Sequence, residues 1–415
     1  MVEAREVETG EHVAVKLIER RRRRGKRRKV EGGNNNPSSA QAQPHQQPQQ
    51  PPPPLAPPPP PPTPSSRPFT KYAEREILNH ASLSHPHVVE LRSVFLTENH
   101  LGIAMELASG GDLFALVAAS SRGLPEADAR WYFQQIVCAL DYCHRAGVAN
   151  RDVKLENALL AEPERPLVKL CDFGYSKHES AQSAPGSRVG TPAYLAPEVV
   201  MATAGQTYDG KAADVWSCGV MLYAMLCACY PFGRPEDAGL AADARLRAML
   251  RRILAANAAL GDLAVSEPCA DLLRGMLVAD PSRRLTLARV QSHPWFLEDL
   301  PAGVAALNDG LLSEQRAERE REEQEQEESG RSGGTTAVAT ATTAPAAATT
   351  APAAAAAAST PPRSRRKQTL AEIRALLAEA AAEEEGEGGD NDCDVDEDDD
   401  LELDVDDALA GGGGD

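Results

Sequence analysis

The sequence predicts an α+β fold built from two lobes of different secondary structure. The run "EHVAVKLIE" (11–19) alternates and is rich in β-branched residues, and similar strand-like runs lie at 87–96 and 100–107. Helical periodicity follows, from 125–147 onward, and includes the apolar run "CGVMLYAMLCACY" (218–230), which is too short to cross a bilayer and is expected to be a buried helix. Because strands come first and helices later, the pattern indicates a sheet lobe followed by a helical lobe, not a βαβ repeat.

The net charge of the chain is concentrated in its C-terminal part. The 415 residues carry a formal charge of −18, but residues 301–415 hold 28 acidic and 9 basic side chains, a net of −19. The first 300 residues, with 34 basic and 33 acidic side chains, are therefore close to neutral. The acidity therefore belongs to the tail, and the net charge of the whole protein does not describe its first 300 residues.

The eight cysteines include no Cys-x-x-Cys pair, which excludes the usual zinc sites and favours buried, reduced thiols. For Cys227 and Cys229, one residue apart in an apolar run, core packing is the favoured interpretation. The N-terminus shows no apolar stretch like a signal peptide. These features indicate an intracellular protein without membrane attachment, which we expect in the cytoplasm and nucleus.

Two low-complexity regions flank the foldable part of the chain. Nine of the ten residues at 20–29 are basic and 51–64 is mostly proline, so residues 21–68 are interpreted as a disordered insertion that ends before a helix at 71–82. After the second lobe, residues 299–366 are expected to be a disordered linker and 382–415 an acidic, solvated tail.

Between the linker and the tail lies one short amphipathic segment, within 367–381. It is expected to be a helix over 369–380, because Thr369 and Glu372 form a capping box. Its apolar face consists of Leu370, Ile373, Leu376 and Leu377.

Several short motifs supply the charges that phosphoryl transfer from ATP requires. That reaction needs a cation on the phosphates, oxygen ligands for magnesium and one carboxylate facing the incoming hydroxyl. In this chain the candidates follow one another as "VAVK" (13–16), "NRDVKLEN" (150–157), "DFG" (172–174) and "APE" (196–198). Any one of these motifs alone is weak; their order and spacing make the signal specific.

Taken together, these motifs resemble those of a eukaryotic protein kinase. More narrowly, the chain is similar to plant and green-algal Ser/Thr kinases of the sucrose-nonfermenting-related group, second subfamily, a stress- and abscisic-acid-responsive type. The segments that carry this similarity are 187–199, 208–220, 230–232, 278–284 and 293–302. The resemblance implies a bilobal protein kinase fold over 1–298, with an N-lobe at 1–105 and a C-lobe at 109–298. It also implies a regulatory box at 367–381.

The resemblance implies that ATP and Mg²⁺ are bound between the lobes. Lys16 would bridge the phosphates and be oriented by Glu76, while Asn157 and Asp172 would hold the metal. The nucleotide would further meet the residues Ala14, Leu159, Met105, Glu106, Ala108 and Asp112, with Met105 as gatekeeper, Glu106–Ala108 as the hydrogen-bonding hinge and Asp112 near the ribose.

For the protein substrate, the resemblance assigns the proton-accepting or orienting role to Asp152. Lys154 would neutralise the transferring phosphate, and Thr191 accompanies Ser/Thr substrates. The five-residue separation of Asp152 and Asn157 lets one loop aim a carboxylate at the substrate and an amide oxygen at a metal. Glu156 suits a basic residue upstream of the target hydroxyl.

Other residues are expected to support the fold or regulate it. Asp214 is expected at the start of the buried helix, capping backbone N–H groups of the catalytic loop. Arg151 is a cation that would attract a phosphate on the activation segment, where Ser187 and Ser183 are the candidate phosphosites. The resemblance also implies a buried C-lobe ion pair, formed by Glu198 and Arg284.

The chain departs from the kinase pattern at two places. No glycine-rich phosphate loop precedes "VAVK", so we expect the first residues to enter the second strand of the N-lobe sheet, with the edge strand missing through a truncated gene model. In addition, Asn150 stands where the family has His. Asn still forms hydrogen bonds but fills less volume, so the expectation is a poorer regulatory stack and retained chemistry.

Two functions remain open from the sequence. The first is an active Ser/Thr kinase acting on protein substrates as a monomer, with an upstream kinase and a phosphatase engaging the C-terminal helix and acidic tail. The alternative is a catalytically impaired kinase-fold scaffold that acts through the same helix and tail. Specific nucleic-acid binding is disfavoured, because the basic run at 20–29 lacks aromatics and a compact basic face.

Overall fold

The computed structural model describes residues 1–7, 9–19, 71–120, 122–163, 167–173, 177–178, 192–202, 207–260, 263–332 and 368–385. The expected insertion at 21–68, the acidic tail beyond Glu385 and most of the activation segment lie outside these residues. Ser183, Ser187 and Thr191 fall there too. Within the described residues, no helix is both long and apolar enough to cross a membrane.

The N-lobe is an antiparallel sheet with the strand order β1-β2-β4-β3. Its strands are β1 (Val2–Arg5), β2 (His12–Glu19), β3 (Leu91–Leu96) and β4 (His100–Glu106). The predicted strand at 11–19 is confirmed as β2, whereas the run at 87–96 becomes a strand only from Leu91. Among the described strands, β1 and β3 form the two edges of the sheet.

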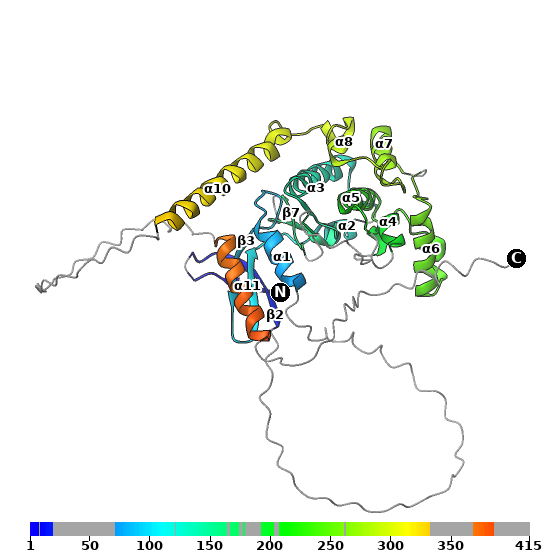
Figure 1. Cartoon of the computed structure of the whole chain (residues 1–415). Coiled ribbons are helices and arrows are strands. Elements are labelled where there is room, and N and C mark those ends of the chain that lie inside the picture. The colour runs from blue at the N-terminus through cyan, green and yellow to red at the C-terminus, as the bar shows by residue number, and fades with distance from the viewer. Residues whose placement is uncertain are drawn as a thin grey trace, which may run out of the picture.

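Two helices cover this sheet. Helix α1 (Lys71–Ala81), predicted at 71–82, lies beside α11 (Leu370–Glu385), which also contacts β3 (Figure 1). The predicted capping box is present, since Glu372 accepts a hydrogen bond from the backbone N–H of Thr369 at 2.9 Å. The N-lobe core joins both helices to the sheet through Ile77, Val89, Val94, Leu101, Ile103, Met105, Ile373 and Leu377. Residues 368–385, far along the chain, therefore complete the N-lobe.

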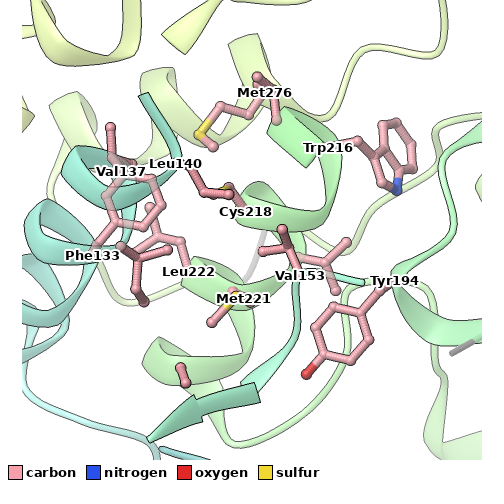
Figure 2. Packing of buried hydrophobic residues seen from close by; sticks show 14 of the residues in the cluster. Phe133, Val137, Leu140, Val153, Tyr194, Trp216, Cys218, Met221, Leu222 and Met276 are labelled. Carbon is pink, nitrogen blue, oxygen red and sulfur yellow. The ribbon is translucent and has the colours of Figure 1, made fainter. Parts of the chain in front are cut away.

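The C-lobe is organised around the long helices α3 (Glu126–Arg145) and α5 (Gly210–Cys227). Figure 2 shows part of this core: Phe133 and Leu140 of α3 lie on one side of Leu222 of α5, and Val153 of the catalytic loop lies on the other, beside Met221. Around them lie α2 (Leu113–Ala118), α4 (Pro197–Met201), α6 (Ala242–Leu254), α7 (Glu267–Met276), α8 (Leu287–Gln291) and α9 (Pro294–Leu297).

Short strands and single turns connect the two lobes to the catalytic loop. They pair as β5 (Val148–Ala149) with β8 (Lys177–His178), and β6 (Ala158–Leu160) with β7 (Val168–Leu170). The 3-10 turns are η1 (Leu155–Asn157), η2 (Pro192–Tyr194) and η3 (Pro235–Gly239). The segment "NRDVKLEN" thus runs from the end of β5 through η1.

The expectation of a disordered linker over 299–366 is wrong for its first part. Helix α10 (Val304–Ser332) packs on α3 and extends toward the N-lobe (Figure 1). It is anchored by Asn308, which donates to the backbone oxygen of Cys138 at 2.9 Å and to Asp141 at 2.8 Å, and by buried Leu312. Buried polar contacts and one apolar side chain hold the start of the helix, so its polar composition does not prevent it from forming.

Candidate active site

The catalytic loop is suspended from helix α5 through its backbone. Asp214 accepts hydrogen bonds from the N–H groups of Asn150 at 2.9 Å and Arg151 at 2.7 Å. The ring of His144 on α3 meets the same carboxylate at 2.7 Å. Arg151 has φ 66°, an unfavourable left-handed conformation for a residue with a side chain, and the bond to Asp214 helps to hold it.

The predicted capping role of Asp214 is therefore confirmed, but its predicted place is wrong. Helix α5 begins at Gly210 and its N-cap is Asp209, which accepts from the N–H of Lys211. Asp214 lies within the helix, so its carboxylate serves a separate segment instead of its own helix end.

The Asp152 side chain is held by two neighbours in the same loop. Its Oδ2 receives Nζ of Lys154 at 2.7 Å and Nδ2 of Asn157 at 2.8 Å, and Asn157 also donates to its backbone oxygen at 2.9 Å. Burial raises the pKa of Asp152 above its usual value, and the nearby charge of Asp172 adds to this, while Lys154 and Asn157 oppose it. The structure thus brings together the three loop residues that the sequence proposes for transfer.

Asn150 holds two parts of the site at once. Its side-chain oxygen accepts from the N–H of Asp152 at 3.1 Å, and its Nδ2 donates to the backbone oxygen of Asp172 at 3.3 Å. On the other side, Phe173 packs 5.2 Å from the ring of His80 on α1. His80 lies one helical turn after Glu76, and the sequence analysis missed it although this spacing was a usable signal.

Lys16 and Glu76 form the pair expected between the sheet and α1. Lys16 Nζ lies 2.6 Å from Glu76 Oε1. Burial lowers the affinity of Lys16 for its proton, but the negative charges of Glu76 and Asp172 outweigh it, so its pKa is raised. Lys16 is therefore a fixed cation that faces Asp172, beside the catalytic loop.

The residues expected around the adenine lie on the two walls between the lobes. Ala14 on β2 is directly opposite Met105 on β4. Leu159 on β6 pairs with Asp112 through an isolated antiparallel β-bridge of their backbones. The carboxylate of Asp112 accepts from the N–H of Ala115 at 2.7 Å and so caps α2. Its expected contact with a ribose stays a prediction.

The hinge after β4 joins the lobes through Glu106. The Glu106 side chain meets Nζ of Lys169 at 2.7 Å, and its backbone N–H donates to Glu90 at 2.9 Å. Within the described part of the chain, no hydrogen bond involves the backbone of Ala108. The expected pairing of Ala108 with a purine stays a prediction, and the contact of Lys169 with Glu106 was not foreseen from the sequence.

The C-lobe ion pair and the regulatory arginine also have partners. Arg284 forms two parallel bonds to Glu198 at 2.7 and 2.8 Å and lies over the ring of Trp216. Arg151 donates to the hydroxyl of Tyr208 and packs on its ring. The first pair is confirmed as predicted; Tyr208 is an additional partner that the sequence did not reveal.

The donor atoms fit the magnesium ion that the kinase pattern implies. Asn157 directs its NH₂ group to Asp152, which turns its amide oxygen away from that carboxylate. Cys171, the neighbour of Asp172, donates its N–H to the backbone oxygen of Asn157 at 3.0 Å, so the two expected ligands are on adjoining segments. Both offer hard oxygen donors, which Mg²⁺ prefers.

Comparison with known proteins agrees with this geometry. The protein kinase domain model matches residues 64–296. Serine/threonine-protein kinase SAPK9 of Oryza sativa subsp. japonica is 44% identical over 249 residues, which cover 60% of this chain and 66% of that protein. Serine/threonine-protein kinase SRK2G of Arabidopsis thaliana is 47% identical over 228 residues, covering 55% and 62%.

A third relative, serine/threonine-protein kinase SRK2E of Arabidopsis thaliana, is 45% identical over 249 residues, covering 60% of this chain and 66% of its own. The chain spans slightly less than two thirds of the length of these relatives. Family, fold and site agree: the chain belongs to the protein kinase family, and within it to the serine/threonine kinases of the sucrose-nonfermenting-related group, second subfamily.

Proposed function

We propose that this protein transfers the terminal phosphate of ATP to serine or threonine hydroxyls of protein substrates. The observation that carries the proposal is the joint presence of the Lys16–Glu76 pair and the Asp152–Lys154–Asn157 cluster, both connected to Asp172. A scaffold that had given up catalysis would not need to keep these charges together.

Each residue has a separable task. Lys16, held by Glu76, binds the phosphates of ATP, and the walls at Ala14 and Leu159 enclose the adenine. Asp152 orients the substrate hydroxyl and accepts its proton, which burial favours because it raises the pKa of the carboxyl. Lys154 lies 2.7 Å from that carboxylate and compensates the charge of the phosphate in transit.

Asn157 and Asp172 are the residues that would hold magnesium. When bound, the metal supplies positive charge that neutralises the phosphate oxygens. The Asn157 amide also fixes Asp152 in place, so this residue has a positioning task within the protein itself.

Regulation by phosphorylation of the activation segment is part of the proposal. Arg151 lies next to Asp152 and bonds to Tyr208, so a phosphate that bound Arg151 would act directly beside the catalytic carboxylate. Ser187 and Ser183 are the candidate acceptors, and Glu156 favours substrates with a basic residue before the target hydroxyl. Stress signalling, with an upstream kinase and a phosphatase as partners, completes this proposal.

The test is transfer of labelled γ-phosphate to a generic basic protein by the full chain and by its Asp152→Asn variant. We expect the variant to lose activity by about 10²- to 10⁴-fold. Asp243→Asn, an exposed change on α6, is the matched control and should leave the rate unchanged. No transfer from the unmodified chain would overturn the proposal and favour the scaffold.

A further inference from the structure

A pair of cysteines lies at the C-terminal end of α5, outside the active site. Cys227 is the last residue of the helix, Ala228 caps it in the left-handed conformation with φ 50° and ψ 29°, and Cys229 follows. A left-handed residue turns the chain back at a helix end. The two cysteines therefore flank this turn, with only Ala228 between them in the chain.

Core packing, the interpretation that the sequence favours for this pair, is wrong for Cys229. Cys229 is exposed and Cys227 only partly buried. Burial, with the adjoining Cys229, raises the pKa of Cys227 to about 12. The pair therefore combines one thiol that solvent reaches with a second, partly buried thiol two residues before it in the chain.

The other described cysteines lack this arrangement. Cys138, Cys143, Cys218 and Cys269 are buried. Cys171 is partly buried, and burial raises its pKa to about 12. Since susceptibility to oxidation follows exposure and thiolate character, Cys229 is the described thiol most open to attack.

From this geometry we infer that Cys227 and Cys229 form a site of reversible oxidation by hydroperoxides. The Cys229 thiolate attacks one peroxide oxygen, the O–O bond breaks, and the departing hydroxide takes a proton to become water, leaving a sulfenic acid. The Cys227 sulfur then attacks the Cys229 sulfur, the S–S bond forms, and the S–O oxygen leaves with the Cys227 proton as a second water. Two thiols and one hydrogen peroxide thus give one disulfide and two waters.

The disulfide would lie on the wall of an apolar groove. Cys229 lines a groove of about 540 Å³ together with Phe114 on α2, Tyr230 and Leu155. Leu155 belongs to the catalytic loop, between Lys154 and Glu156. Oxidation at the pair would therefore reshape a surface that reaches the loop, and this site is independent of the proposed activity.

The experiment uses the full chain carrying Cys393→Ser, because Cys393 lies outside the described residues and would otherwise be a competing thiol. The protein is treated with one equivalent of hydrogen peroxide, remaining thiols are blocked, and intact and peptide masses are measured. The expected product has lost the mass of two hydrogen atoms, the loss maps to the peptide holding Cys227 and Cys229, and dithiothreitol reverses it.

Three variants in the same background make the assignment. Cys229→Ser should abolish the disulfide, whereas Cys227→Ser should leave a sulfenic acid on Cys229 that dimedone traps. Cys171→Ser is the matched control and should oxidise like its parent. Circular dichroism verifies that each variant is folded, and the exposed Cys229 position makes its variant the safer one. Failure of the parent to lose two hydrogens, or an unchanged loss in Cys229→Ser, would overturn the inference.

Discussion

The amino group of Lys16 lies 2.6 Å from the carboxylate of Glu76, although 60 residues separate the two in the chain. Glu76 is positioned by α1, and its neighbour Ile77, only 1% exposed, packs in the same cluster as Ile373 and Leu377 of α11. A helix from near the C-terminus therefore supports the helix that orients the ATP-binding lysine. The position of α1, and with it this ion pair, depends on that support.

Shortening both buried side chains of α11 should weaken this support. We expect Ile373→Ala with Leu377→Ala to lower basal kinase activity and raise KM for ATP, because each large-to-small change in a core costs about 2–5 kcal/mol. Steady-state kinetics would measure the effect. The control is Glu379→Ala, an exposed position on the same helix, which should behave like the parent. Unchanged kinetics in the double variant would mean that α11 does not support α1 in solution.

Removing the charge of Asp152 should stabilise the protein while abolishing its activity. The folded-state pKa of this carboxyl is raised, chiefly by burial. The folded protein therefore holds the proton more tightly than the unfolded chain, and the Asp152 charge costs stability as pH rises above the usual value of 3.8. Asp152→Asn should show a higher Tm at neutral pH, with the difference shrinking on acidification toward that value. A lower Tm at neutral pH would contradict this.

Breaking the ion pair between Arg284 and Glu198 should be severe. The Arg284 side chain is fully buried, and removing one partner of a buried pair leaves an uncompensated charge. Glu198→Ala should reduce the free energy of unfolding by about 3–5 kcal/mol in urea denaturation. The matched surface pair is Arg274 with Glu267, both largely exposed, and Glu267→Ala should cost about 1 kcal/mol or less. Equal losses at the two sites would argue against a buried pair.

Glycine at position 228 should stabilise the chain. Ala228 adopts a left-handed conformation that costs a residue with a Cβ about 1–2 kcal/mol, and glycine avoids this cost. Allowing for the greater freedom of glycine in the unfolded chain, we expect Ala228→Gly to gain about 0.5–1 kcal/mol in thermal or urea unfolding. Ala378→Gly, at an exposed position inside α11, should lose about the same amount. A loss at both positions would show that position 228 is not left-handed in solution.

Residues whose role is a short local pattern could be predicted from the sequence. Lys16, Asp152 and Asn157 lie in motifs whose order and spacing carry the chemistry, and the structure pairs Lys16 with Glu76 and Asn157 with Asp152. The capping box of Thr369 and the apolar face of α11 were likewise readable, because helix signals are local.

What the sequence did not reveal depends on contacts between distant segments. Helix α10 reads as a charged linker, yet Asn308 and Leu312 fasten its start to α3. Tyr208 contacts Arg151 across 57 residues, and no local pattern announces such a partner. The start of α5 is a different case: it was predicted about one turn too late, at Asp214, although Asp209 supplies a local N-cap signal.

The attachment of the catalytic loop to Asp214 has a consequence for how such a protein can vary. Both backbone bonds that hold Asn150 and Arg151 come from α5, deep in the C-lobe, and neither involves the sheet. A long insertion between β2 and α1 thus enters the lobe that binds and regulates, and leaves the anchoring of the transfer residues untouched. The N-lobe can therefore accept inserted sequence while the C-lobe keeps the attachment of its catalytic loop.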